Sequence, residues 1–410
     1  MSGDGFASTD AKTITDVTRR IVTLDILRGF ALFGMILVHF HARFRETTDL
    51  ESFFGEKYVG WVVWLGVEQK SWATFAFLFG VGFAILMRRW EAKGLPLVPP
   101  YLRRMAALAA IGAAVLVLTD FHVLMEYALW GGVLLVFRNR STKALLIVAV
   151  VAAALPALVR LGLGLLELQA VGRAGADAAW EARQGATPAM AAATSYWQVV
   201  AQRLAKLPSN IADLSMPTSS FTLFLLGLLA VRHRILDEPR QHTSLIARAM
   251  ALGLASWLAF WLLLPHLPTD FSSTRVVLPI RYGLGVISDQ WLGFTYIGAL
   301  VLLLAWRPWW TERLAAIGVA GRMALTNYVL QCFVLEYLSS PFGLGLALRP
   351  YYYVLGAVVL FGIQVVASRT WLSHFRFGPL EWLWRSATYM RWQQMRIGRA
   401  EPAALVATGS

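Results

Sequence analysis

Cysteine and charged residues are scarce in this chain. Its 410 residues include one cysteine, Cys332, which excludes an intrachain disulfide and a metal cluster built on cysteines. Charged residues make up only 15% of the chain, whereas apolar residues make up 57%. This balance is unlike that of a soluble domain and is typical of a protein whose helices cross a membrane several times.

Several signatures of well-known activities are also missing. The chain has no Walker A loop, no nucleophile elbow and no metalloprotease helix. His39 and His41 are two residues apart, so they face different sides of a helix, and no metal site is expected. No internal repeat is visible, which weakens the case for a transporter built from inverted repeats without excluding it.

Long apolar runs are abundant instead, and the mean hydropathy of the chain is +0.57. Because a helix needs about 20 apolar residues to cross a bilayer, we expect an all-α polytopic bundle of about ten transmembrane helices. The expected spans are 24–40, 72–88, 102–119, 122–137, 143–162, 218–232, 245–264, 291–306, 323–340 and 352–371.

The distribution of Lys and Arg predicts the orientation of these spans. With a cytoplasmic N-terminus, the inner segments carry more than twice as many Lys and Arg residues as the outer ones. Both termini are therefore expected in the cytoplasm. The net charge of +13 follows from this bias and from contact with membrane lipids, so no nucleic acid partner is expected.

The composition divides the chain into three parts. A polar cytoplasmic segment, 1–23, precedes an integral membrane domain, 24–371. Within that domain, the Ala-rich external segment 163–216 has the spacing of surface helices and is either a passive connector or part of a substrate-binding roof. The basic, aromatic tail, 372–410, is expected to lie on the cytoplasmic interface with no function beyond anchoring.

The first span, "LDILRGFALFGMILVHFH" at 24–41, carries three polar residues that are costly in a membrane. On an α-helix, Arg28 and His39 point in directions only about 20° apart and lie about 16 Å apart along the axis; Asp25 falls about 60° away. Each residue alone has a simple explanation, such as snorkelling or pairing with a neighbour. Together they predict a polar stripe that faces the interior of the bundle.

Further polar residues gather at the outer ends of other spans. Glu68 and Lys70 precede the second span, while His122 and Glu126 open the fourth and share one helix face. A carboxylate beside an imidazole can orient a general base and stabilise its protonated form. The alternative is that external water simply hydrates these groups.

Two further clusters each have two interpretations. Four arginines at the inner surface either clamp the phosphates of a nucleotide-bearing donor or only reflect the positive-inside rule. They are Arg88, Arg89, Arg103 and Arg104. Asn327 and Gln331, one turn apart in the ninth span, either contact a substrate or hold helices together.

Four stretches resemble the YeiB family, bacterial membrane proteins whose C-terminal half is a domain of unknown function. They are "LDILRGFALFGMILVH" at 24–39, "FAFLFGVGFA" at 75–84, "GRMALTNYVLQC" at 321–332 and "FGPLEWLWRSATY" at 377–389. The resemblance covers almost the whole chain, with a YeiB-type C-terminal region at about 218–395. It implies a multi-pass protein of the bacterial inner membrane.

The YeiB family is similar in turn to transmembrane acyltransferases, which include enzymes that modify surface glycans and the lysosomal heparan glucosaminide acetyltransferase. That group shares an Arg early in the first span and a His eleven residues later, which Arg28 and His39 match. The chain departs from the usual YeiB pattern at His39 and His122, where many members carry Asn and Asp.

The resemblance implies a transfer of an acyl group, with acetyl as the expected one, from cytoplasmic acyl-CoA to a hydroxyl or amine. His39 is then the general base, with Glu126 or Glu68 as its orienting carboxylate, and no cofactor is bound tightly. Arg28 and the four inner arginines are the expected donor ligands. The acceptor, a glycan, a lipid-linked compound or a small molecule, is expected near His122, Lys70, Asn327 and Gln331.

Two other functions stay open at this point. The polar stripe is also suited to a proton relay in a proton-coupled transporter or exporter of a small metabolite. In a noncatalytic membrane protein, the same residues would only fix helix packing. The oligomeric state, the acceptor and the acyl chain do not follow from these residues.

Overall fold

The computed structural model describes residues 4–44, 56–184, 194–208, 218–266 and 277–397. These residues form helices and their connections, without a strand; an isolated bridge joins Phe375 to Arg396. The prediction of an all-α protein is therefore confirmed.

Seven helices in the described part of the chain are long and apolar enough to cross a membrane. Their apolar stretches are Val22–Phe44, Tyr58–Glu91, Val98–Thr119, Thr142–Gly175, Thr243–His266, Gly283–Trp306 and Pro350–Leu372. The second of these stretches combines two consecutive helices, α2 (Glu56–Gly66) and α3 (Glu68–Glu91). The expected spans 122–137, 218–232 and 323–340 coincide with shorter helices, α5 (Val123–Phe137), α9 (Ser219–Arg232) and α14 (Ala324–Ser339). The number of crossings and the cytoplasmic position of the termini stay predictions.

The helices at the other seven expected spans differ from those spans mainly in length. They are α1 (Asp4–Phe44), α3 (Glu68–Glu91), α4 (Val98–Thr119), α6 (Thr142–Gln184), α10 (Thr243–Leu263), α11 (Val277–Trp306) and α15 (Pro350–Leu372). The remaining elements are α2 (Glu56–Gly66), α7 (Tyr196–Ala205), η3 (Leu264–His266), α12 (Trp309–Arg313), α13 (Ala315–Arg322) and α16 (Pro379–Tyr389).

The segment 163–216 is only partly a set of surface helices. Its first part continues the fifth expected span as α6, which bends at Gly172, where φ is +67°. A short amphipathic helix, α7, follows, and residues 185–193 and 209–217 lie outside the described residues. The sequence pattern did not reveal the continuation because Ala-rich segments favour a helix whether or not a membrane surrounds it.

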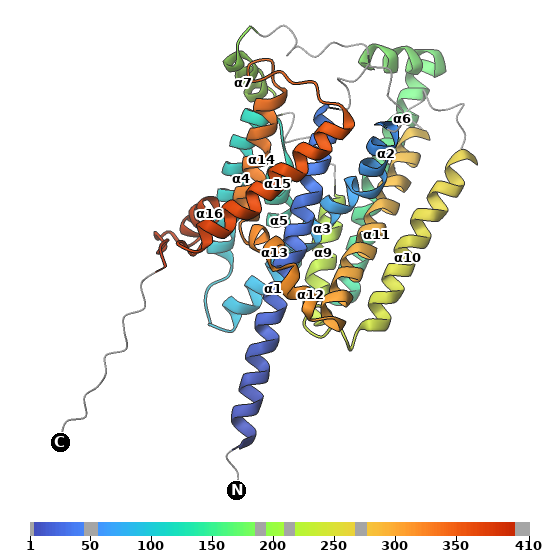
Figure 1. The fold of residues 1–410 in the computed structure, drawn as a ribbon. Helices are drawn as coiled ribbons and strands as arrows, with labels where there is room; N and C mark the ends of the chain where they lie inside the picture. The colour runs from blue at the N-terminus through green and yellow to red at the C-terminus, as the bar shows by residue number, and fades with distance from the viewer. Residues whose placement is uncertain (1–3, 45–55, 185–193, 209–217, 267–276, 398–410) are drawn as a thin grey trace, which may run out of the picture.

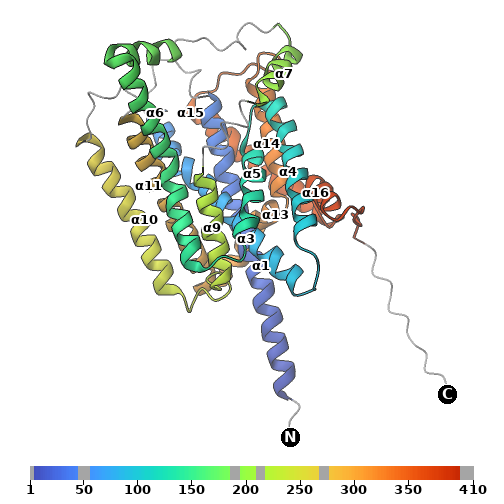
Figure 2. The same cartoon turned by 180° about the vertical axis from the view of Figure 1, so that it is seen from behind.

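Helix α1 runs through the middle of the bundle (Figure 1). It packs against α3, α13, α14 and α15, while α10 and α11 pack on each other at one side. Figure 2 shows α5 and α6 on the opposite face from α15. Because α1 lies at the centre, Asp25 and His39 are buried among the other helices.

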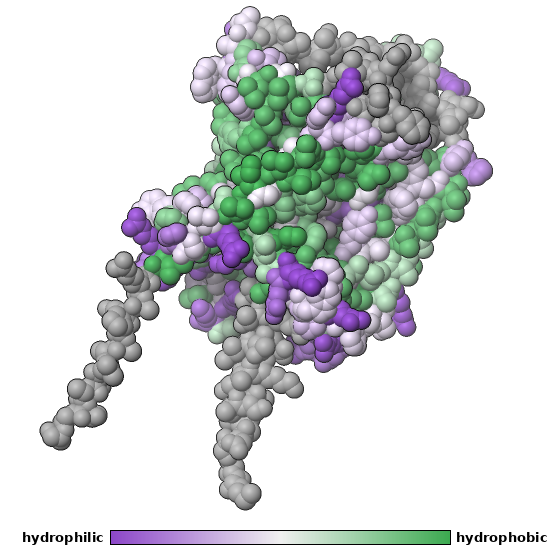
Figure 3. All heavy atoms as spheres, in the orientation of Figure 1, coloured by the Kyte–Doolittle hydropathy of each residue, from purple (hydrophilic) through white to green (hydrophobic). Residues whose placement is uncertain are grey.

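We name the two ends of the bundle by α1: it begins at the lower end in Figure 1 and finishes at the upper end. Helix α16 belongs to the lower end, because Trp384 Nε1 donates to the carbonyl oxygen of Arg104 in the first turns of α4, at 2.7 Å. Apolar side chains form a band across the middle of the visible face, and hydrophilic side chains gather toward the lower end (Figure 3).

Close helix packing depends on glycine. A Cβ atom on Gly80 of α3 would lie 2.1 Å from the carbonyl oxygen of Phe224 in α9, and one on Gly227 would lie 2.2 Å from that of Phe77. Small residues allow this backbone approach, which is a main source of helix association where no water is expelled. Helices α3 and α9 are thereby fixed against each other.

We expect Gly80→Ala to lower the thermal unfolding midpoint of the purified protein, because the methyl group overlaps the backbone of α9. The matched control is Gly82→Ala in the same helix, where an added Cβ meets no atom within 4 Å. That variant should unfold at the wild-type midpoint or slightly above it, since Ala favours a helix. Equal midpoints for both variants would contradict the packing described.

Two neighbouring cavities beside helix α1

The predicted polar stripe of α1 is present. Arg28 Nη1 donates to Asp25 Oδ1 at 2.8 Å, with Asp25 buried and the Arg28 side chain 31% exposed. His39 is buried farther up the same helix, and its ring centroid lies 4.5 Å from that of Phe121. The two ends of the stripe open into different cavities.

The lower cavity, of about 520 Å³, is basic. It is lined by Arg28, Arg89 and Arg104, three of the five arginines expected as donor ligands. That they bind phosphates stays a prediction. Arg322 and Arg385 also line the cavity, although the sequence analysis did not select them. Both occur inside stretches that resemble the YeiB family, and this position is the only feature of the sequence that could have marked them as site residues. Farther in, the cavity is apolar and aromatic, with Leu78, Phe79, Met105, Leu108, Tyr127 and Tyr328 among its lining.

The other two selected arginines lie outside this cavity. The Arg88 side chain is 45% exposed and donates to Asp237 Oδ2 at 3.3 Å. Arg103 is exposed and does not line either cavity. Sequence spacing could not separate the four because the faces of α3 and α4 that meet are decided by tertiary packing.

The upper cavity, of about 320 Å³, contains four residues that the sequence analysis selected. His39, Glu68, His122 and Glu126 all line it, from α1, α3 and the start of α5. Glu126 is buried and accepts a hydrogen bond from the Ser220 hydroxyl of α9. Within the described residues, His39 Nδ1 makes no hydrogen bond. The cavity therefore combines imidazoles and carboxylates, side chains that can act as general acids and bases.

The two cavities are neighbours, because Met35 of α1 and Val123 of α5 line both of them. Met35 is one helical turn from His39, about 6 Å along the axis. The lower cavity therefore extends to within about one helical turn of the imidazole.

Three residues proposed as substrate ligands instead connect helices. Lys70, 1% exposed, donates to Asp289 Oδ1 of α11 at 2.6 Å. Asn327 Nδ2 donates to Ser368 Oγ at 2.9 Å, and Gln331 Nε2 donates to Gln364 Oε1 at 2.8 Å, both across α14 and α15. None of the three lines either cavity, so this geometry favours the packing interpretation.

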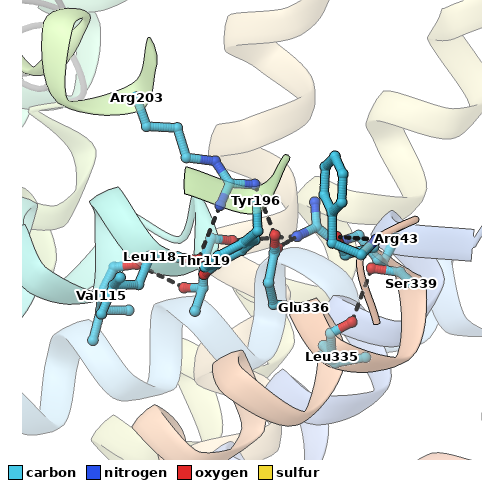
Figure 4. A network of polar contacts seen from close by, with 11 residues as sticks. Arg43, Val115, Leu118, Thr119, Tyr196, Arg203, Leu335, Glu336 and Ser339 are labelled. Carbon is cyan, nitrogen blue, oxygen red and sulfur yellow. Dashed lines mark hydrogen bonds and ion pairs between the residues drawn. The ribbon is translucent and has the colours of Figure 1, made fainter. Parts of the chain in front are cut away.

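At the upper end, an ion-pair network fastens α7 to the bundle (Figure 4). Glu336 of α14 accepts hydrogen bonds from Arg43 of α1 and from Arg203 of α7, the latter at 3.0 Å. Arg203 also donates to the carbonyl oxygen of Leu118 at the end of α4, at 2.9 Å. No local pattern in the sequence marks Arg43 or Arg203, since the partners of this network are far apart along the chain.

Metal binding has no support in the described residues, which contain no group of three or more His, Cys, Asp or Glu side chains placed to hold an ion. The described residues thus form a helical membrane bundle with two neighbouring cavities beside its central helix, one with arginines and one with His and Glu in its lining.

The chain matches two known protein families, one in each half. Residues 20–200 match the family described as heparan-alpha-glucosaminide N-acetyltransferase, catalytic, and residues 230–391 match the family described as protein of unknown function (DUF418). No solved structure matches the chain.

Two bacterial relatives extend over nearly the whole chain. The uncharacterised protein YxaH of Bacillus subtilis (strain 168) is 32% identical, covering 92% of this chain and 96% of YxaH. The uncharacterised protein YeiB of Escherichia coli (strain K12) is 27% identical, covering 90% of this chain and 96% of YeiB. The chain belongs to the YeiB family, as the resemblance of its motifs predicted.

We expect Glu336→Gln to destabilise the protein by about 2 to 4 kcal/mol in chemical unfolding, because two guanidiniums then lose their shared carboxylate. Amide hydrogen exchange should increase within α7, which the network holds in place. The control is Glu312→Gln on α12, an exposed carboxylate. Unchanged exchange in α7 would show that other contacts fasten it.

Proposed function

We propose that this protein is a membrane acyltransferase. It moves an acyl group, with acetyl as the expected one, from acyl-CoA at the lower end to a hydroxyl or amine of an acceptor in the upper cavity. The lower end faces the cytoplasm, and the membrane is the inner membrane of a bacterium. The reaction needs acyl-CoA as a co-substrate and no tightly bound cofactor.

One observation carries this proposal: a basic cavity and a cavity with imidazoles and carboxylates share Met35 and Val123. Guanidiniums suit the phosphates of a nucleotide-bearing donor, and the apolar inner part of the lower cavity suits its uncharged thioester arm. An acceptor beside His39 is then close to the end of that arm. This proximity supports direct transfer, because a positioned pair of reactants avoids much of the entropy cost of meeting.

The proposed chemistry is an acyl exchange at a thioester. His39 takes the proton of the acceptor hydroxyl or amine as its oxygen or nitrogen attacks the carbonyl carbon. A C–O or C–N bond forms, the C–S bond breaks, and the CoA thiolate leaves with a proton returned from the imidazole. Glu126 or Glu68 would position His39 and stabilise its protonated ring.

The match to an acetyltransferase catalytic family gives this proposal further support. The matched segment, 20–200, includes Arg28, Arg89, Arg104 and His39, and also the two carboxylates of the upper cavity. The activity in that family's description belongs to that family, and its transfer to this chain is part of the proposal.

A proton-coupled transporter is the second candidate, and the two cavities separated by Met35 and Val123 are the observation that favours it. The two functions are separated by product analysis. Purified protein supplied with labelled acyl-CoA and candidate acceptors should form acylated product if it is a transferase. Substrate flux into proteoliposomes that follows a pH gradient and needs no acyl-CoA would instead favour transport.

We expect His39→Ala to reduce acyl transfer at least about 100-fold, because it removes the general base. Binding of acyl-CoA should persist, since His39 does not line the lower cavity. The control is His41→Gln, two residues along α1, where the native imidazole contacts Tyr353 Oη at 2.8 Å outside both cavities. Wild-type transfer by His39→Ala would exclude the proposed mechanism.

We expect Val123→Phe to impede the approach of donor and acceptor, because this side chain lines both cavities where they are neighbours. Acyl transfer should fall about tenfold or more, with a smaller change in the Kd for acyl-CoA, whose phosphates bind at the arginines. The matched control, Val123→Ala, removes bulk at the same place and should retain transfer. Equal rates in the two variants would mean that the donor and the acceptor do not meet there.

A further inference from the structure

Helix α16, which the sequence analysis treated as an interfacial anchor, forms a wall of the lower cavity. Glu381, Trp384, Arg385 and Tyr389 all line that cavity. These residues occupy one face of a strongly amphipathic helix at the lower end of the bundle. The helix therefore has a structural place beyond the anchoring expected from the sequence, as one wall of this cavity.

Three anchors hold this wall in place. Glu381 accepts hydrogen bonds from the backbone N–H groups of Leu325 and Thr326, at 2.7 and 3.0 Å, and so caps the start of α14. Trp384 donates to the Arg104 carbonyl oxygen, and the Arg104 guanidinium lies 3.4 Å from the centroid of the Trp384 ring. Trp90 of α3 donates to Tyr389 Oη at 3.2 Å. Helix α16 is thus fixed to α3, α4 and α14 together.

The wall adds positive charge where the cavity already has it. Five arginines and one carboxylate line the cavity among the described residues, and hydrogen bonds from α14 engage both oxygens of that carboxylate. Arg385 is exposed; its guanidinium lies over the rings of Phe377 and Tyr389, 5.1 and 5.3 Å from their centroids. In the described residues it forms no ion pair with a carboxylate. A guanidinium held by aromatic rings without an acidic partner is free to bind an anion.

We infer that the C-terminal region of unknown function completes the donor site, and that Arg385 of α16 binds the phosphates of the donor's nucleotide part. This inference rests on the proposed function and extends it, because it assigns a role to residues 230–391, which include Arg322 and all of α16. The N-terminal segment supplies Arg28, Arg89 and Arg104 to the same cavity, so neither segment forms the site alone.

The test separates the nucleotide part of the donor from its thioester arm. Binding of acetyl-CoA and of acetyl-pantetheine, which has the same thioester but no phosphates, is measured on the purified full-length protein by titration calorimetry. We expect Arg385→Gln to raise the Kd for acetyl-CoA about tenfold, the usual size of one lost charge-assisted hydrogen bond. Its Kd for acetyl-pantetheine should equal that of the wild type.

The control variant is Arg391→Gln, in the turn that follows α16, where the native side chain is exposed and lies outside the cavity. It should bind both compounds like the wild type. If Arg391→Gln lost as much affinity for acetyl-CoA as Arg385→Gln, the general positive charge of the tail would explain the effect, and the inference would be overturned. If Arg385→Gln lost affinity equally for acetyl-CoA and acetyl-pantetheine, the inference would also be overturned, since a structural role of Arg385 would explain the result.

The phosphate of an anionic lipid headgroup is the other group that Arg385 could bind in the same way. The titrations are therefore repeated in bilayer discs with and without anionic lipid. If Arg385→Gln changes only lipid binding and leaves the affinity for acetyl-CoA intact, the inference fails while the proposed function stands. If the wild-type protein binds neither acetyl-CoA nor acetyl-pantetheine, the proposed function fails as well.

Discussion

A charged side chain buried between membrane helices must have an opposite charge beside it or face a hydrated cavity, and this constraint determines where the polar residues of this protein lie. Lys70 meets Asp289 between α3 and α11, and Arg28 meets Asp25 on α1. Glu336 forms ion pairs with Arg43 and Arg203 at the upper end. The Lys70–Asp289 pair and the Glu336 network fix the depth and rotation of the helices that they join, because sliding one helix would leave a charge in an apolar environment. The Arg28–Asp25 pair lies within α1 and only neutralises charge there.

The charged groups that line the two cavities satisfy this constraint by facing a cavity. Arg89, Arg322 and Arg385 line the lower cavity, and Glu68 and Glu126 line the upper one. Of the described residues, five arginines and one carboxylate line the lower cavity, whereas two carboxylates and two histidines line the upper one. The lower cavity is therefore the more basic of the two and the one suited to an anion.

The central position of α1 makes the N-terminal and C-terminal parts of the chain interdependent. Helix α13 packs so closely on α1 that a Cβ on Gly321 would lie 2.0 Å from the carbonyl oxygen of Asp25. Helix α14 carries Glu336 to Arg43, and α16 closes the side of the lower cavity beside Arg104. The C-terminal region therefore holds the helix that bears Arg28 and His39, as well as contributing its own cavity residues.

Hydropathy and helical periodicity determined the membrane class, the all-α fold and the common stripe of Arg28 and His39, because these properties depend only on residues near each other in the sequence. The four-residue spacing likewise placed His122 and Glu126 on one face. Tertiary structure alone decided that Arg89 and Arg104 line a cavity while Arg88 and Arg103 do not, and that Lys70 pairs with Asp289. It also joined Arg43, Glu336 and Arg203, and it brought Arg385 into the cavity of Arg28. Such contacts depend on which helix faces meet, and burial and charge pairing across the whole bundle select those faces.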